Sequence, residues 1–393
     1  MRVGVPAEVT SGEFRVAITP AGVHELTRAG HQVLIQAGAG TGSSLPDEDF
    51  AAAGASVLHS ADDVWGEADL VLKVKGPAAG EYHRLRPGLV LFSYLNLAAS
   101  GDYTQELLAS RVTAVGYETV QRRGGSLPLL APMSQVAGRM AVPIGAHYLQ
   151  GGALHAQRGG RGVLLGAVAG GRAATVTVLG AGTGGRSAAA AALGLQADVV
   201  LLDAVEARLR AAGAVLAGPG VQGRLRTAVA DAGAVERAVL AADLVIGAVL
   251  EPGARSPVLV SRELAARMKP GAVVVDLSVD QGGCFADSRP TSHGDPVYQV
   301  GDTVFHCVVN LPGVVPHTST YALTAATLPY AVAIANRGWR EALRDDDALA
   351  AGLNAHDGIL TCAPVAHAHQ LPYTEADKVL TDGPRRRAAG RLC

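Results

Sequence analysis

The chain has 393 residues, which is enough for two domains with separate hydrophobic cores. Hydrophobic residues make up 49% and charged residues 17%, which is typical of layered α/β proteins and excludes a disordered chain. The net charge of −2 gives no reason to expect nucleic acid or an anionic membrane surface as a partner, and no apolar run is long enough to span a bilayer.

The first part of the chain alternates between predicted strands and helices. Residues 2–5 form an apolar strand, and Thr19 followed by Pro20 is typical of a helix N-terminus. This helix should end at Gly30, before a strand at 31–36. Further strands are predicted at 69–74, 89–94 and 112–117. The alternation predicts a parallel sheet in this region.

A glycine-rich motif follows the apolar strand predicted at 175–179. Gly180, Gly182 and Gly185 have the G-x-G-x-x-G spacing, an alanine-rich helix follows, and a second apolar run ends in Asp203. In this order the glycines permit a tight turn, close approach of a pyrophosphate and close helix packing, while the carboxylate binds ribose hydroxyls. A 2′-phosphate would be repelled by Asp203, and no arginine directly follows it, so NAD(H) is the expected cofactor.

The remaining predicted elements complete a second sheet, and the chain then returns to the first domain. A helix kinked at Pro143 is predicted over 136–157, and buried strands are predicted at 242–249 and 272–277. The apolar helix at 318–336 should return to the first domain, because the dinucleotide unit does not need it. We therefore predict an α/β protein with two Rossmann-like, doubly wound parallel sheets.

Two lysines and one arginine are candidates for binding a small acid. Lys73 and Lys75 lie at the end of one predicted strand, on one face by alternation, in a chain with only four lysines. An ammonium can give up a proton and a guanidinium cannot, so Lys75 is a candidate to polarise a carbonyl, with Lys73 behind it. The alternative is a pair of solvated charges. Arg15 is either a surface residue or a bidentate partner for a substrate carboxylate.

Other polar residues are ambiguous. Asp280 follows a buried strand and either orients water near the nicotinamide or only forms a turn, and Asn310 has the same two interpretations. The histidines at 306, 317, 367 and 369 do not have the spacing of a metal site, and neither do the scattered cysteines. We expect no metal, and the cysteine content together with the lack of a signal peptide favours the cytoplasm.

The motifs together resemble the alanine dehydrogenase and transhydrogenase N-terminal family over nearly the full chain. The matching stretches include MRVGVPAE, GEFRVAITPAGV, LVLKVKGP, YETVQ, LPLLAPMSQVAGR, VLGAGTGG, ADLVIGAVLEPGA, MKPGAVVVDLSVDQGGCF and TSTYALTAATLPY. The resemblance implies a discontinuous catalytic domain at 1–132 and 308–381 and an NAD-binding domain at 133–307. The basic tail at 382–393 is expected to be disordered.

The resemblance also implies roles for single residues. Arg15 and Lys75 hold the carboxylate and carbonyl oxygen of a 2-oxo acid, and Asp280 is the active-site aspartate. The positions that line the cofactor or substrate pocket are Met133, Ser134, Asp203, Arg208, Val249, Leu250 and Asn310. Family members are hexamers or dimers, so we expect a homo-oligomer.

One position departs from the family pattern. The family has a histidine as general acid/base in an L-H-L-A motif, and here the segment reads YLNLAA, with Asn96 at that position. An amide does not titrate near neutral pH. The leading hypothesis is a reversible, NAD-dependent oxidative deamination of L-alanine or a similar amino acid, with Lys75 or Asp280 moving the proton and Tyr94 as a substitute donor. The alternatives are another amine or imine substrate in secondary metabolism, or an impaired NAD-binding homologue.

Overall fold

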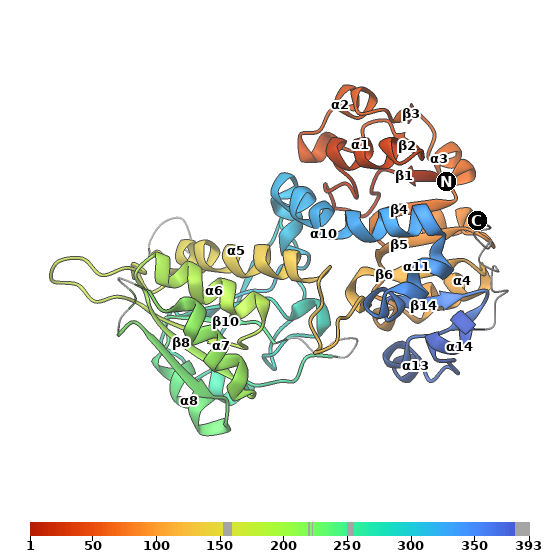
Figure 1. Cartoon of the computed structure of the whole chain (residues 1–393). Coiled ribbons are helices and arrows are strands. Elements are labelled where there is room, and N and C mark those ends of the chain that lie inside the picture. Colours follow the sequence, from red (N-terminus) through yellow and green to blue (C-terminus); the bar gives the residue numbers. More distant parts are fainter. Residues whose placement is uncertain (152–158, 219–220, 222, 250–254, 382–393) are drawn as a thin grey trace, which may run out of the picture. The chain divides into compact units, whose positions relative to one another are not determined.

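The computed structural model describes residues 1–151, 159–218, 221, 223–249 and 255–381. Within these residues the chain forms two units, Met1–Leu130 with the segment that begins at Pro316, and Ala131–Val315. We call them the terminal unit and the central unit. Figure 1 shows the C-terminal blue helices gathered with the red and orange elements of the N-terminal end. The division falls after Leu130 and Val315, where the sequence had suggested residues 132 and 307.

The terminal unit contains an eight-stranded sheet in the order β15-β14-β6-β5-β4-β1-β2-β3. Its strands are β1 (Arg2–Val5), β2 (Gln32–Gln36), β3 (Ser56–Leu58), β4 (Leu70–Lys75), β5 (Val90–Tyr94), β6 (Thr113–Gly116), β14 (Leu353–His356) and β15 (Ile359–Leu360). Its helices are α1 (Pro20–Arg28), α2 (Asp47–Ala52), α3 (Ala61–Glu67), α4 (Gly101–Ala109), α10 (Pro316–Arg337), α11 (Trp339–Asp345), α12 (Asp347–Ala350), α13 (Ala363–His369) and α14 (Ala376–Thr381). The pairs among β1–β6 are parallel, whereas β14 joins antiparallel.

The central unit contains a seven-stranded sheet in the order β12-β13-β11-β10-β7-β8-β9. Its strands are β7 (Thr175–Leu179), β8 (Asp198–Asp203), β9 (Leu225–Val229), β10 (Leu244–Gly247), β11 (Val273–Asp276), β12 (Val297–Val300) and β13 (Thr303–His306). Its helices are α5 (Ala131–Leu149), α6 (Thr183–Gly194), α7 (Glu206–Leu216), α8 (Ala232–Ala241) and α9 (Arg262–Ala265). Only β12 pairs antiparallel, with β13.

The prediction of two parallel-dominated Rossmann-like sheets is confirmed. Read from the opposite edge, the first six strands of the terminal sheet have the order 3-2-1-4-5-6 of the dinucleotide-binding fold, and the central sheet has the order 3-2-1-4-5 with β13 in the sixth place. In such sheets the strand order reverses between the first and fourth strands, which are β1 and β4 in one unit and β7 and β10 in the other. Ligands bind at this switch point, outside the carboxyl ends of the strands.

Residues of the central strands alternate between two cores. Val176 and Val178 of β7 pack in one apolar cluster with Ala188 of α6, whereas Leu179 packs in a second cluster with Val235 of α8. Because the sheet is buried on both faces, its strands read as continuous apolar runs in the sequence. Among the helices that the structure describes, none has the length and apolar character of a membrane-spanning segment.

Several predicted boundaries need correction. Helix α5 begins at Ala131 and ends at Leu149 instead of covering 136–157; Pro132 lies in its first turn, where proline is favoured. The helix capped by Thr19 and Pro20 forms as predicted, and the Thr19 side chain accepts the N–H of Gly22. The tail at 382–393 lies outside the described residues.

Helix α5 packs closely on α6 because one glycine lets the two helices meet (Figure 1). A Cβ on Gly138 would lie 2.1 Å from the Gly184 carbonyl oxygen. We expect Gly138→Ala to lower the free energy of unfolding by about 1–3 kcal/mol, through overpacking. Gly213→Ala in α7 is the control, since nothing lies within 4 Å of its added Cβ, and it should be neutral or stabilising. Urea unfolding measures both, and equal stability of the two variants would contradict this packing.

Candidate active site

The glycine-rich turn of the central unit has the geometry of a pyrophosphate cradle. Gly180 has φ +102°, and a Cβ there would lie 2.4 Å from the Ala248 carbonyl oxygen. A Cβ on Gly185 would lie 1.7 Å from the Gly180 carbonyl oxygen, so only glycine fits. The Cβ direction of Gly182 meets nothing within 4 Å, which leaves room beside the backbone at the start of α6. These positions match the roles that the motif predicts.

Asp203 is joined directly to this turn. Its side chain is 6% exposed and accepts the N–H of Ala181 at 2.7 Å and the N–H of Val205 at 2.8 Å. A carboxylate has about four acceptor positions, so ribose hydroxyls are compatible with these two bonds. Arg208 lies on the solvent side, with its Nη1 3.8 Å from Asp203 Oδ1. The turn and Asp203 therefore fit a dinucleotide with an unphosphorylated ribose.

The loops after β10 and β11 lie at the same end of the central sheet. Val249 is linked to the Ser278 hydroxyl through its N–H at 3.1 Å and its carbonyl at 2.7 Å. Asp280 follows in a short helical turn and accepts the N–H of Asn310 at 3.3 Å. Asp280 and Asn310 are thus brought together, as a shared site requires. Leu250, which was also predicted to line the pocket, lies outside the described residues.

Asp276 holds the loop that carries Asp280. It is 2% exposed and accepts the N–H groups of Ser278 and Cys284, each at 2.9 Å, and the Ser288 hydroxyl at 2.5 Å. Burial raises the pKa of Asp276, while these bonds act in the opposite direction. Sequence reasoning missed this residue because its partners lie up to 12 positions further along the chain.

The first turns of α5 approach the glycine-rich turn. The carbonyl oxygen of Ser134 lies 3.5 Å from the Cβ position of Gly184. Met133, one residue earlier, is buried with 6% exposure. The structure therefore places Ser134 beside the cradle, within the central unit.

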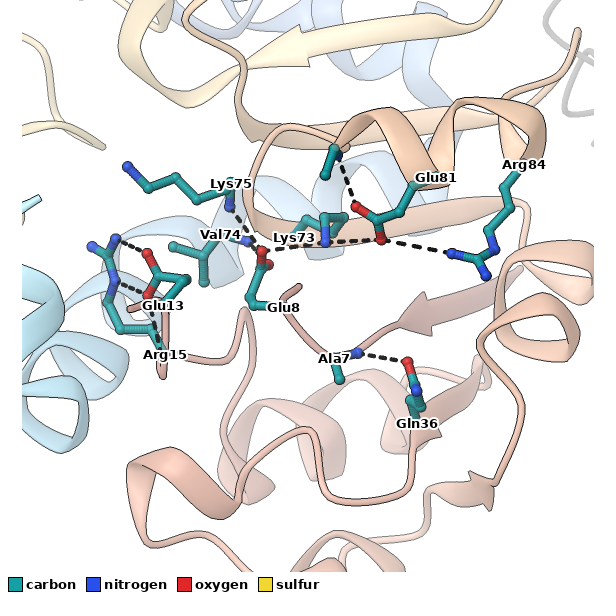
Figure 2. A network of polar contacts seen from close by, with 11 residues as sticks. Ala7, Glu8, Glu13, Arg15, Gln36, Lys73, Val74, Lys75, Glu81 and Arg84 are labelled. Atoms are coloured by element: carbon teal, nitrogen blue, oxygen red, sulfur yellow. Dashed lines mark hydrogen bonds and ion pairs between the residues drawn. The ribbon is translucent and has the colours of Figure 1, made fainter. Parts of the chain in front are cut away.

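In the terminal unit, Lys75 ends β4 and Arg15 lies in the segment that follows β1, so both residues follow from the strands that flank the switch point. Arg15 follows β1 and is 3% exposed, and its Nε bonds to Glu13 Oε1 at 2.6 Å while its Nη2 bonds to Glu13 Oε2 at 2.5 Å. This bidentate pair fixes the plane of the guanidinium. Figure 2 shows the Lys75 side chain on the side of the network where Glu13 and Arg15 lie. The charges of Arg15 and Lys75 both lower the pKa of Glu13.

Lys73 differs from the expectation of a shared strand face. Its side chain is fully buried between Glu8 and Glu81, and it points away from the Lys75 ammonium (Figure 2). The reason is an irregularity in the pairing of β4 with β5 between Leu72 and Lys75, which interrupts the simple alternation. The interpretation of Lys73 as a solvated charge is therefore wrong.

Asn96 lies at the carboxyl end of β5 with an exposed side chain and a left-handed backbone, φ 49°. Its N–H donates to Glu118 Oε1 at 2.7 Å, and the N–H of Leu95 donates to the same carboxylate at 3.1 Å. Burial raises the pKa of Glu118, although these N–H groups and the charge of Lys75 oppose the shift. Glu118 thus holds residue 96 in place. The backbone N–H groups that its side chain binds lie 22 or more positions away in the sequence, so these bonds could not be inferred from sequence spacing.

Two further residues from the sequence analysis, the substitute donor Tyr94 and the histidine His306, lie in buried surroundings. The hydroxyl of Tyr94 donates to the Leu129 carbonyl at 2.7 Å, and burial raises its pKa far above the ordinary value, so it does not fit the role of substitute donor. Burial lowers the pKa of His306 to about 4, which makes it a neutral core histidine. Among the residues that the structure describes, no three His, Cys, Asp or Glu side chains gather as metal ligands.

The strand order and the residues at the switch points define a Rossmann-type dinucleotide-binding protein with a second unit of the same topology. Two family models match the chain, "Alanine dehydrogenase/PNT, N-terminal domain" over residues 4–137 and "Alanine dehydrogenase/PNT, C-terminal domain" over residues 141–363. The chain belongs to the alanine dehydrogenase/PNT family.

Similar proteins agree with this assignment. The alanine dehydrogenase of Mycobacterium tuberculosis is 54% identical over 97% of this chain and 100% of its own length. That of Methanococcus maripaludis is 44% identical over the same shares. A solved structure of an L-alanine dehydrogenase, 44% identical, has a TM-score of 0.86 and covers 94% of this chain and 99% of that one. A transhydrogenase from Sinorhizobium meliloti, 26% identical, has a TM-score of 0.75 over 92% and 99%.

The buried Glu13–Arg15 pair predicts a pH-dependent contribution to stability. Burial alone would raise the pKa of Glu13, but the bonds from Arg15 outweigh it and the pKa is lowered. A carboxyl with a lowered pKa stabilises the fold above its unfolded pKa, and this contribution disappears as the pH falls through the folded pKa. Glu13→Gln should cost about 3–5 kcal/mol near neutral pH, because it removes the charged partner of a buried guanidinium. The loss relative to wild type should shrink in acid.

Urea unfolding at several pH values measures this difference. Glu206→Gln is the matched control, because Glu206 pairs with Arg210 at 2.8 Å but both side chains are about two-thirds exposed, 67% and 68%. Exposed pairs contribute little. A similar loss in both variants, or a loss for Glu13→Gln that does not change with pH, would contradict the assignment.

Proposed function

We propose that the protein is an NAD-dependent amino-acid dehydrogenase that converts L-alanine reversibly to its 2-oxo acid and ammonia. The observation that carries the proposal is the placement of Arg15 after β1 and of Lys75 at the end of β4, the strands that flank one switch point, in a chain whose full length matches alanine dehydrogenases. A guanidinium held in plane by Glu13 suits a substrate carboxylate. The Lys75 ammonium at the end of β4 suits the atom on the α-carbon of the substrate, which is the oxygen of a 2-oxo acid or the nitrogen of an imine. This atom is two bonds from the carboxylate carbon.

The terminal unit is proposed to hold the amino acid and the central unit to hold NAD. Arg15 anchors the carboxylate, and Lys75 donates a hydrogen bond that polarises the C=O or C=N bond. Asp280, beside Asn310, orients the water or ammonia, and Met133 packs against the substrate. Ser134, Asp203, Arg208, Val249 and the three motif glycines hold the dinucleotide. Bound there, the cofactor would supply the hydride acceptor for the α-carbon in deamination and the hydride donor in the reverse reaction.

Asn96 is proposed to occupy the position of the family's acid/base histidine. Glu118 fixes its backbone, so its amide is placed to orient the substrate, but an amide does not titrate near neutral pH. Proton transfer then falls to Lys75 or Asp280. This substitution is also the observation that favours a second candidate, a family member specialised for another amine or imine, for which less acid/base help is needed. A catalytically impaired NAD-binding homologue is the third.

We also propose a cytoplasmic homo-oligomer, a hexamer or dimer. Three cysteines, Cys284, Cys307 and Cys362, are buried free thiols, which suits a reducing compartment. Light scattering of the purified protein would give the subunit number.

The function is tested by following the absorbance of the reduced cofactor. NAD with L-alanine should produce NADH, and NADH with pyruvate and ammonia should be consumed. Lys75→Ala should lose turnover in both directions while still binding NADH, because NADH binding is assigned to the central unit. Turnover only with another amine or imine would support the second candidate. NADH binding without turnover on any amino acid would support the third.

Asn96→His should raise kcat/KM for L-alanine by about tenfold or more, since a positioned acid/base contributes about 10²–10⁴ in rate. The variant should also gain an ionisation near the ordinary histidine pKa of about 6.5, below which deamination slows. Asn96→Gln is the control: it keeps an amide and should show neither change. If the histidine variant is no faster than wild type, proton transfer at residue 96 does not limit the reaction.

A further inference from the structure

On the side of β1, the end of strand β4 is held by a side chain, while Lys75 still pairs with Tyr94 of β5 on the other side. Pairing with β1 is regular only at Leu70 and Val71, and pairing with β5 is irregular after Leu72. The N–H of Val74 donates to Glu8 Oε1 at 2.6 Å, and the N–H of Lys75 lies 3.4 Å from Glu8 Oε2. The carboxylate of Glu8 therefore replaces the backbone acceptors at the position just before the Lys75 side chain.

A second carboxylate holds the chain just beyond Lys75. Glu81 Oε2 accepts the N–H of Ala78 at 3.0 Å. The ammonium of Lys73 lies 3.2 Å from Glu8 Oε2 and 3.3 Å from Glu81 Oε1, so it joins the two carboxylates (Figure 2). We call Glu8, Lys73 and Glu81 the Lys73 clamp. The clamp binds the backbone N–H of Val74 through Glu8 and that of Ala78 through Glu81, so it holds the backbone on both sides of Lys75.

The clamp is buried, so each of its charges is stabilised by its charged partners and not by water. The side chains of Lys73, Glu8 and Glu81 are 0%, 3% and 3% exposed. Buried charges are costly unless they are paired, so loss of the ammonium leaves two carboxylates without their shared counter-ion. A compact ammonium with three donors can bond two carboxylates at once. Lys73 is fully buried, in a chain that otherwise uses arginine for nearly all of its positive charge.

We propose that Lys73 is a positioning residue for the reaction. Through Glu8 and Glu81 it fixes the 74–78 backbone, and thereby the direction in which Lys75 presents its ammonium to the substrate. The inference rests on the proposed role of Lys75, but Lys73 itself does not touch the substrate. Small displacements of a polarising group reduce catalysis strongly, because the reacting atoms must be aligned.

The test compares two clamp variants with a matched control. Glu8→Gln keeps an acceptor oxygen for Val74 but removes the charge, and Lys73→Met keeps the length of the side chain without the ammonium. Each should raise KM for pyruvate about tenfold or more and lower kcat. The dissociation constant of NADH, measured by fluorescence, should stay within about twofold of wild type, because its proposed site lies in the central unit.

Arg86→Gln is the control for a general loss of stability in the same unit. Arg86 donates to the carbonyl oxygens of Trp65 at 2.8 Å and Gly66 at 3.2 Å and so ties the segment before β5 to the C-terminal end of α3. It should destabilise the protein without changing KM for pyruvate. If the clamp variants and Arg86→Gln change KM equally, or if none of them changes it, the positioning role of Lys73 is refuted.

Two further measurements keep the proposal open to refutation. If Lys73→Met does not fold, the double variant Glu8→Gln/Lys73→Met, which removes one charge of each sign, should fold and keep the high KM. Hydrogen exchange read by mass spectrometry should show the amides of Val74, Lys75, Gly76 and Ala78 exchanging about tenfold faster in the clamp variants and unchanged in Arg86→Gln. Unchanged exchange in all variants would overturn the clamp. If wild type does not turn over pyruvate, the proposed function fails, and exchange alone decides the clamp.

Discussion

The hydrogen bond from a backbone N–H at a strand end to a buried carboxylate is the interaction on which both sites depend. A parallel strand that outruns its neighbours has N–H groups without ladder acceptors, and these must be satisfied when they are buried. In the terminal unit, Glu8 and Glu118 accept N–H groups at the ends of β4 and β5. In the central unit, Asp203 accepts an N–H in the turn after β7, and Asp276 accepts one in the loop after β11. Because bonds to ionised acceptors are stronger than neutral ones, short loops can be held rigidly where a sheet no longer supports them.

The two units place different chemical groups at corresponding positions. Both sheets have the same strand order over their parallel part, and in each the candidate residues follow the strands that flank the point of reversal. In the central unit those loops present backbone N–H groups and an open glycine, which suit phosphates. In the terminal unit they present a guanidinium and an ammonium, which suit a small carboxylic acid. A common topology therefore gives two chemistries, decided by the residues placed just after the strands.

Local signals in the sequence were sufficient for much of the fold. The Thr19–Pro20 helix start, the glycine-rich turn and the central strands β7 and β11 could all be predicted, because caps, glycine spacing and apolar runs are local. The antiparallel strands β12, β14 and β15 were missed because they are short and carry no strong alternation.

For the candidate site, the residues expected to bind ligands could be predicted from their motifs. The buried carboxylates that hold the backbone of those residues could not. Glu8 reaches a backbone 66 positions away, and Glu118 one 22 positions away. Such pairings exist only once the sheet has formed. The burial of Lys73 was missed for the same reason: period-two alternation does not anticipate an irregular register.

The central unit is inserted in the sequence of the terminal unit, and this sets the order in which the two units can fold during synthesis. The central unit is a continuous segment, complete when residue 315 has been made, whereas the terminal unit still lacks α10 at that moment. The Thr320 hydroxyl in α10 accepts the N–H of Val16 at 3.1 Å and contacts the Ser43 hydroxyl at 2.8 Å. The loop that carries Arg15 thus gains this anchor only after the ribosome has passed residue 320. A nascent chain can form its central Rossmann-type unit early, whereas the loop of Arg15 reaches its final position last.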